Sequence, residues 1–409
     1  MIEALKSFSI DKSDWMPVKF GDVVYEPKES VKDPAAAGIE HVVGLEHIDS
    51  EDIHLRRSAS IEDGTTFTKK FDVGDVLFGR RRAYLKKAAK ADFSGICSGD
   101  IIVMRAKDNL LPKLLPFIVN NDKFFDFAIK HSAGGLSPRV KFKNLAEYEF
   151  RLPPKSTQTR LAELLWASNE QLNSRFNLAK AVSITFKSKA KRLIEQGVDT
   201  LNESKSTRFG SYCMKWELLK ISDFCEVVGG NAFKSARFKP HANHQVIRIG
   251  NVTPDGFNFD KTPVFIQNLE PSEERFLIPC GAIVVSLTGT NGKRDYGHPT
   301  LMRQQNKYLL NQRLAMIFAN RKIMLPEFLL LLSKMEFFQG AFFLNATGTA
   351  NQANVSISDV LKIKLPVPQV SEQRKIVNVL EKIRLAKSSN EAAIEKCAQL
   401  EKFLIDQVF

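Results

Sequence analysis

The sequence contains few cysteines, and their spacing gives no sign of a disulfide framework or a zinc site. Among 409 residues there are five, an odd number, and no two are separated by only two positions. No histidine stands near them at the spacing of a metal ligand. We therefore expect reduced thiols and no metal for Cys97, Cys213, Cys225, Cys280 and Cys397.

Long apolar runs are also missing. The longest, Phe328–Leu332 and Ala341–Leu344, are far shorter than the ~20 residues that a membrane-spanning helix needs. The first ten residues include Glu3 and have no apolar signal-peptide core. These absences predict a soluble cytoplasmic protein.

Motifs of known catalytic sites are absent as well. Gly292-Lys293 resembles the end of a phosphate-binding loop, but Leu287 replaces its first glycine and Arg294 its Ser or Thr. The sequence has no GxGxxG, HExxH or GxSxG pattern and no Asn-Pro-Pro-Tyr motif. We expect a binding protein that is not an enzyme and holds no cofactor or metal of its own.

The most informative feature that is present is a repeat of half the chain. Trp15–Asp22 returns as Trp216–Asp223, and Leu152–Leu161 returns as Leu365–Ile376. Solenoid units recur every ~20–50 residues, so a repeat of this length indicates a duplicated domain. Two similar surfaces on one chain suit a ligand with two similar sites.

Each half begins with a mixed α and β pattern. Short strands are predicted near residues 75–78 and 101–104 in the first half, and near 282–285 and 314–317 in the second. Helical patches are predicted within 110–127 and 324–338. The expected domains are residues 1–152 and 201–366, each followed by a long helix, within residues 153–200 and 367–409.

The two helical segments contain neither Gly nor Pro between Ser156 and Gln196, nor between Ser371 and Val408. Ser156 and Ser371 are candidate N-caps. Apolar residues recur every seven positions, which predicts a coiled-coil seam; these are Leu165, Leu172, Ala179, Phe186 and Leu193, then Ile376, Ile383, Cys397 and Leu404. Asn169 and Asn390 also fall on the seam, where they either fix the register or are merely tolerated.

Positive charge narrows the choice of ligand. Lys and Arg number 59 against 46 Asp and Glu, a net charge of +13, which favours nucleic acid. Basic and polar residues gather in two loops of each half, where they could contact phosphates or base edges. The candidate DNA-binding residues are Lys69, Lys70, Arg80, Arg81, Arg82, Lys86, Lys87, Ser137, Arg139, Lys141, Thr288, Thr290, Asn291, Lys293, Arg294, Asn351 and Gln352.

Together these segments resemble the specificity subunit of a type I restriction–modification system. The resemblance covers essentially the whole chain and is carried by short motifs: Gly134–Ser137, Leu152–Pro154 and Gln158, then Thr347–Thr349, Ile357–Asp359, Leu365–Pro368, Glu372–Gln373 and Ile376. It implies an α+β fold with two similar mixed α/β target-recognition domains, separated by two long helices that form an antiparallel coiled coil.

The resemblance also implies partners. In that family, each domain reads one half of a bipartite, asymmetric sequence in double-stranded DNA. The coil docks two methyltransferase (M) subunits, and restriction/translocase (R) subunits join them. S-adenosylmethionine, ATP and Mg²⁺ are then expected on the partner subunits, in the cytoplasm of a bacterium or archaeon. The alternatives are a module of a modification-only system, a non-catalytic scaffold that holds two protein partners apart, and an undetected nuclease or methyltransferase.

Overall fold

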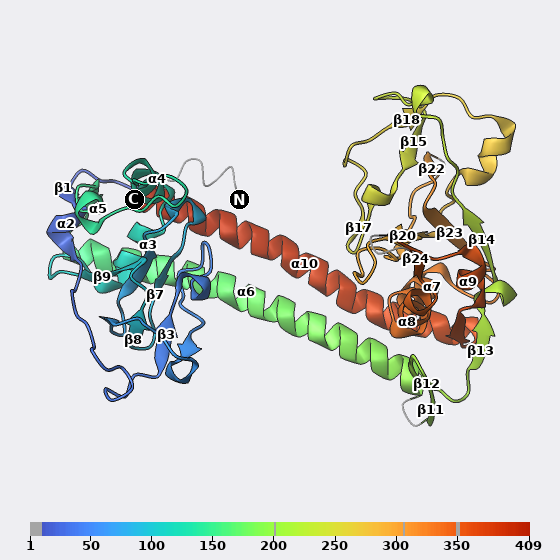
Figure 1. The fold of residues 1–409 in the computed structure, drawn as a ribbon, viewed down its shortest axis with the longest axis horizontal. Helices are drawn as coiled ribbons and strands as arrows, with labels where there is room; N and C mark the ends of the chain where they lie inside the picture. The colour runs from blue at the N-terminus through green and yellow to red at the C-terminus, as the bar shows by residue number, and fades with distance from the viewer. Residues whose placement is uncertain (1–9, 200–201, 306, 349–351) are drawn as a thin grey trace. The chain divides into compact units, whose positions relative to one another are not determined.

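The computed structural model describes residues 10–199, 202–305, 307–348 and 352–409 (Figure 1). Its contacts divide the chain into two compact units. Unit 1 comprises Met1–Ala179 and Asn390–Phe409, and unit 2 comprises Lys180–Ser389. This division differs from the four consecutive segments expected from the sequence, because each unit contains one globular domain together with a part of both long helices.

Unit 1 is built on two four-stranded sheets, with strand orders β2-β9-β6-β7 and β4-β3-β8-β5, and on the separate pair β1-β10. The strands are β1 (Met16–Lys19), β2 (Val24–Tyr25), β3 (His41–Val43), β4 (Ala59–Ser60), β5 (Lys69–Phe71), β6 (Val76–Gly79), β7 (Ala88–Lys90), β8 (Gly95–Cys97), β9 (Ile101–Ala106) and β10 (Glu149–Leu152). The short helices are α2 (Phe20–Val23), α3 (Leu115–Val119), α4 (Asp122–Lys130) and α5 (Phe142–Leu145).

Unit 2 has a four-stranded sheet in the order β14-β23-β19-β21, three-stranded sheets β18-β15-β22 and β20-β25-β24, and three separate pairs. The strands are β11 (Ser204–Thr207), β12 (Gly210–Cys213), β13 (Glu217–Lys220), β14 (Cys225–Gly229), β15 (His244–Ile247), β16 (Val252–Thr253), β17 (Gly256–Phe257), β18 (Phe265–Ile266), β19 (Ile283–Ser286), β20 (Thr288–Gly289), β21 (Thr300–Leu301), β22 (Tyr308–Leu310), β23 (Leu314–Ala319), β24 (Thr347–Gly348), β25 (Ala353–Asn354) and β26 (Lys364–Val367). Its short helices are α7 (Pro326–Ser333), α8 (Glu336–Leu344) and α9 (Ile357–Lys362).

The two units share a central topology, as the sequence repeat predicts. The antiparallel order β2-β9-β6-β7 corresponds to β14-β23-β19-β21, and the pair β1-β10 corresponds to β13-β26. One parallel pair occurs in each unit, β3 with β8 and β15 with β22. The four predicted strand runs are confirmed in β6, β9, β19 and β23, and both helical patches are confirmed in α3 with α4 and in α7 with α8.

The two long helices are α6 (Lys155–Gln196) and α10 (Val370–Val408). Each begins one residue before its serine, so Ser156 and Ser371 lie inside the first turn and their predicted N-cap role is wrong. Among the residues that the structure describes, no helix is both long and apolar enough to span a membrane.

Both helices contribute to the core of each unit. In unit 1, Leu165 of α6 and Leu404 of α10 are buried in one apolar cluster. In unit 2, Leu193 of α6 and Ile376 of α10 are buried in another. The helices therefore stabilise each domain by hydrophobic burial, in addition to any contact between themselves.

The helices pair antiparallel in unit 1. Asn169 donates to Glu401 Oε1 at 2.7 Å, and further along α6 the carbonyl of Arg175 accepts from Asn390 at 2.9 Å. From Asn169 to Arg175 the residue number rises along α6, while the residue bound on α10 changes from Glu401 to Asn390. The two helices therefore run in opposite directions. Phe176, which lies midway along α6 at the companion position of the heptad between Leu172 and Ala179, is 52% exposed, so the seam is less well packed there.

A buried glutamine holds the start of each long helix to its domain in the same way. In unit 1, Gln158 accepts from Leu111 N at 2.7 Å and donates to two carbonyls, each at 3.0 Å. In unit 2, Gln373 accepts from Leu325 N at 2.8 Å and donates to two carbonyls at 2.7 and 2.8 Å. In each unit one glutamine side chain thus makes hydrogen bonds to three backbone groups, one of them the amide that precedes a helix beginning with proline. Gln158 and Gln373 are therefore structural counterparts.

We predict that Gln158→Ala and Gln373→Ala each lower the free energy of unfolding of their own unit by about 1–3 kcal/mol, because buried backbone groups lose their partners. Urea unfolding of the full chain, followed by domain-resolved hydrogen exchange, measures the effect. The exposed Gln171 on α6 offers a matched control, and Gln171→Ala should be close to neutral. Equal unfolding midpoints for all three variants would contradict the prediction.

The five cysteines are unpaired. Burial raises the pKa of the Cys97 and Cys225 thiols to about 12. These two thiols stay protonated at neutral pH and are poor nucleophiles.

Candidate nucleic-acid interface

In unit 1 the structure brings the two predicted loops together. The segment after β6 pairs with the later loop, residues 132–141, through a bridge between Arg81 and Arg139. Backbone bonds continue this contact, from Arg82 N to Pro138 O at 2.8 Å and from Val140 N to Arg80 O at 3.0 Å. Segments that lie nearly sixty positions apart in the sequence therefore present their side chains on one surface.

A cluster of guanidinium groups forms where these loops meet. Asp100, at the start of β9, accepts from Arg139 Nε at 2.7 Å and pairs with Arg81 at 3.5 Å. Ser137 Oγ accepts from Arg81 and Arg82 at 3.2 and 3.4 Å. We call Arg81, Arg82, Ser137, Arg139 and Asp100 the arginine cluster.

Two features of the arginine cluster indicate a binding surface. Arg82 has φ +55°, a left-handed conformation that is strained for a non-glycine residue and typical of functional sites. The side chains of Arg81 and Arg139 are 39% and 44% exposed. Their guanidinium groups can therefore reach a ligand, and phosphate and base edges are suitable acceptors for them.

The ion pair with Arg139 holds the pKa of Asp100 below its ordinary value. A carboxyl group with a lowered pKa stabilises the fold above its unfolded-state pKa, and that contribution is lost as the pH falls through the folded-state value. Asp100 is therefore ionised at neutral pH and keeps the arginine side chains in place.

Unit 2 repeats the arrangement with different side chains. β20 pairs with β25, and β24 pairs with β25 on its other side. Thr288 and Thr347 both face Asn354, just as Arg81 and Ala133 both bridge to Arg139 in unit 1.

The pairing corrects the sequence alignment of the loops by one position. Alignment of the sequence 132–141 with the sequence 346–355 sets Arg139 against Ala353. The structure instead places Asn354 in the position that corresponds to Arg139. Arg81 likewise corresponds to Thr288. Asn354 is exposed and accepts from Gln352 Nε2 at 3.3 Å. It was not among the residues predicted from the sequence, because polar loops of different length cannot be aligned correctly by composition alone.

The remaining polar residues of the unit 2 loop are held by local contacts. Asp295 accepts from the backbone and hydroxyl of Thr290 at 2.9 and 2.6 Å, which lowers the pKa of Asp295. Arg294 pairs with Glu336 at 3.0 Å. Lys293 and Asn291 are exposed at the tip of the loop.

None of the six predicted lysines belongs to the arginine cluster, and four of them are bound within their own domain. Lys69 pairs with Glu26 at 3.2 Å and Lys70 with Asp72 at 3.1 Å. Lys86 pairs with Asp122 at 2.6 Å, and Lys87 donates to a carbonyl. These four lysines therefore bind acidic side chains or a carbonyl of their own domain. Their role in DNA binding stays a prediction.

The side chain of Arg80 points back to the neighbouring loop, where its Nε donates to the carbonyl of Val140 at 3.1 Å. Lys141 is exposed directly before α5, next to the arginine cluster in sequence. Asn351 lies outside the described residues.

The family model described as "Type I restriction modification DNA specificity domain" matches residues 12–175 and 214–399, one match in each half of the repeat. The chain belongs to the type I restriction–modification specificity family. This membership confirms the resemblance seen in the sequence, including a non-catalytic role as the specificity subunit. The fold expectation, two similar mixed α/β domains with two long antiparallel helices, is confirmed as well.

Relatives of this specificity subunit agree with the assignment. The chain is 24% identical over 296 residues to the type I restriction enzyme MjaVIII specificity subunit of Methanocaldococcus jannaschii, covering 71% of this chain and 67% of the relative. It is 30% identical over 125 residues to the EcoDI specificity subunit of Escherichia coli, covering 30% and 28% of the two chains.

Two solved structures share the fold. A type I S subunit from M. genitalium superposes with a TM-score of 0.59 at 12% identity and covers 98% of both chains. A chain from a study of assembly and conformational transition of the type I R-M system gives 0.57 at 16% identity, covering 97% of both.

We predict that Asp100→Asn increases non-specific binding of duplex DNA and lowers discrimination. The local charge rises by one unit, so the slope of log K against log salt should steepen by about one. Arg81 and Arg139 also lose the carboxylate that orients them, so the ratio of cognate to non-cognate affinity should fall.

Fluorescence anisotropy over a salt series measures both effects. Asp92→Asn, which removes an exposed acid paired with Lys90 elsewhere in the domain, is the matched control. An unchanged affinity ratio for Asp100→Asn would show that the arginine cluster does not read DNA.

Proposed function

We propose that this specificity subunit reads a bipartite, asymmetric DNA sequence. The single observation that carries the proposal is that the same loop arrangement occurs in both units with different side chains. In unit 1 the segment after β6 pairs with loop 132–141. In unit 2 the segment after β19 forms β20, which pairs with β25, and β25 pairs with β24. Arginines dominate in unit 1, whereas Thr288 and Asn354 occupy the counterparts in unit 2. Unlike side chains favour different bases, so the two half-sites should differ in sequence.

The charge of the chain supports duplex DNA as the ligand. Its net charge is +13, and phosphate contacts by Lys and Arg position a protein on DNA. In the proposed mechanism, residues such as Arg82, Arg139, Lys293 and Asn354 contact phosphates and base edges. The helices α6 and α10 set the distance between the half-sites.

We further propose that the helices dock two methyltransferase (M) subunits, with restriction/translocase (R) subunits joining them. Large apolar side chains on the helices support this, since Ile184 is 60% exposed and Leu385 is 54% exposed. S-adenosylmethionine, ATP and Mg²⁺ would be bound by these partner subunits and not by this chain.

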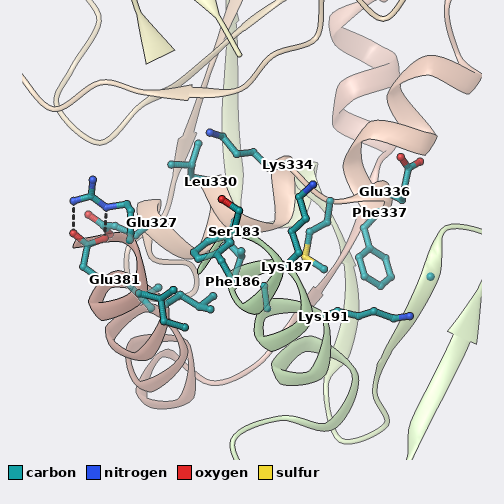
Figure 2. Close-up of a pocket in the computed structure, with 18 of the residues that line it drawn as sticks. Ser183, Phe186, Lys187, Lys191, Glu327, Leu330, Lys334, Glu336, Phe337 and Glu381 are labelled. Atoms are coloured by element: carbon teal, nitrogen blue, oxygen red, sulfur yellow. Dashed lines mark hydrogen bonds and ion pairs between the residues drawn. The ribbon is translucent and has the colours of Figure 1, made fainter. Parts of the chain in front are cut away.

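A groove in unit 2 also supports docking of a partner helix. It has a volume of about 950 Å³ and lies between α6, α7 and α10 (Figure 2). Figure 2 shows Phe186 and Lys187 on one wall and Leu330 and Lys334 on another. The α6 residues that line it span roughly 20 Å at ~1.5 Å per residue, which would accommodate an amphipathic helix of three to four turns.

An insertion in both helices tests whether the helices determine the gap, that is, the number of base pairs between the two half-sites. Seven residues, one heptad, are added to both helices, after Leu178 in α6 and after Ser388 in α10, where the neighbouring side chains are exposed. A heptad preserves the seam and lengthens the pair by about 10.5 Å, close to three base-pair steps of about 3.4 Å. We expect the reconstituted complex to methylate a target whose gap is longer by about three base pairs.

The same insertion in α6 alone is the control. It should abolish methylation, because α6 is then longer than α10 and the two helices cannot both pack into the two domains. Methylation of the original target by an assembled double-insertion complex, with the gap unchanged, would contradict the proposal.

A further inference from the structure

A polar network lies buried between the two helices of unit 1. Asn169 and Glu401 are only 7% and 8% exposed, and Asn169 Nδ2 donates to Glu401 Oε1 at 2.7 Å. On its other side, Asn169 Oδ1 accepts from Asn173 Nδ2 at 2.8 Å and lies 2.7 Å from His54 Nε2. With its proton on Nε2, His54 donates to the same amide oxygen. The network therefore joins α6, α10 and the globular domain.

The loop that carries His54 makes a second connection to α6. Asp52 accepts from the backbone of His54 at 2.9 Å and from Arg56 Nε at 2.6 Å. Arg56 in turn donates to Asn173 Oδ1 at 2.7 Å. Residues 52–56 thus reach the helix through two side chains that are tied to each other.

An indole ring covers the network. Trp166 of α6 lies edge-on to His54, with ring centroids 5.7 Å apart, and packs against Phe117 at 5.1 Å. Its Nε1 donates to the carbonyl of Lys113 at 2.9 Å. Burial raises the pKa of Glu401, which agrees with a site that excludes water. In such a site a hydrogen bond is stronger, and an unpaired group is costly.

The network has no counterpart of the same kind at the equivalent helix positions of unit 2. Taking Gln158 and Gln373 as equivalent, Trp166 corresponds to Glu381 and Asn169 to Arg384. Glu381 and Arg384 pair with each other on α10 at 2.6 and 2.7 Å. The equivalent helix positions of unit 2 thus bind each other, while those of unit 1 bind the domain.

We propose that His54, Asn169 and Glu401 are positioning residues that hold the first recognition domain in one orientation on the helix pair, and so restrict the gap between half-sites that the complex accepts. Hydrophobic contacts tolerate small rotations, whereas a buried network satisfies its donors and acceptors in one geometry only. A gap that is wrong by one base pair displaces a half-site by about 3.4 Å, more than a hydrogen bond to a base edge tolerates.

This inference rests on the proposed function, and the experiment separates the two. Complexes reconstituted with methyltransferase subunits are given duplexes with the native gap and with gaps one base pair shorter and longer. The measured quantity is the ratio of the methylation rate on the native gap to the rate on each altered gap. Rates on duplexes with one substituted base in a half-site are measured in parallel.

The informative variants are Asn169→Ala and His54→Leu, each of which removes the hydrogen bond between His54 and Asn169. We expect each to reduce the gap ratio at least about fivefold, the lower end of typical coupling between sites. Discrimination against a substituted base should stay as in the wild type. Glu401→Gln keeps an oxygen that can accept from Asn169 and should retain the wild-type ratio.

Asn390→Ala is the matched control, because Asn390 is a buried asparagine whose side-chain hydrogen bond runs from helix to helix, to Arg175 O. It should leave the gap ratio unchanged. Should Asn169→Ala fail to assemble, His54→Leu decides, since His54 lies at the edge of the network.

An unchanged ratio in an assembled His54→Leu complex would overturn the inference, as would an equal reduction by Asn390→Ala. Both of these outcomes leave the proposed function standing. A wild-type complex that methylates all gaps equally would overturn the proposed function, and this inference with it.

Discussion

The architecture depends on burial of both long helices in the core of each unit. Leu165 and Leu404 belong to one core, and Leu193 and Ile376 belong to the other. Each buried leucine or isoleucine contributes about 1.5–3 kcal/mol, so neither domain can rotate on its helices without losing several such contacts. The buried glutamines Gln158 and Gln373 add hydrogen bonds to this attachment, and hydrogen bonds require a particular orientation of helix and domain. Recognition loops on the domain are consequently fixed relative to the helices of the same unit.

On this common framework the two units have diverged in their polar side chains. The proposed recognition surface of unit 1 is a cluster of arginines held by Asp100, whereas unit 2 has threonine and asparagine at the corresponding places. The attachment differs too, since unit 1 has the His54 network where the equivalent positions of unit 2 pair along α10. The two units share the hydrophobic contacts that specify the fold and differ at polar positions, both exposed ones in the loops and buried ones on the helices.

The sequence predicted the architecture better than the site. Strands such as β6 and β19 were found because apolar runs between turn residues depend on local pattern, and the repeat in the sequence revealed the duplicated topology. The charge count could not separate Arg81 from Lys69, because the partner of Lys69 is Glu26, more than forty positions away. The one-position error between Arg139 and Asn354 has a similar cause, since strand pairing and not composition determines which loop residues correspond.

The central claim is that two unlike readers on one chain recognise two unlike half-sites. Single-molecule methylome sequencing of the host, with this gene present and deleted, tests it most directly. The account predicts a methylated motif made of two different parts separated by a fixed gap, present only when the gene is intact. A continuous or palindromic motif that disappears with the gene, or a methylome that does not change at all, would contradict it.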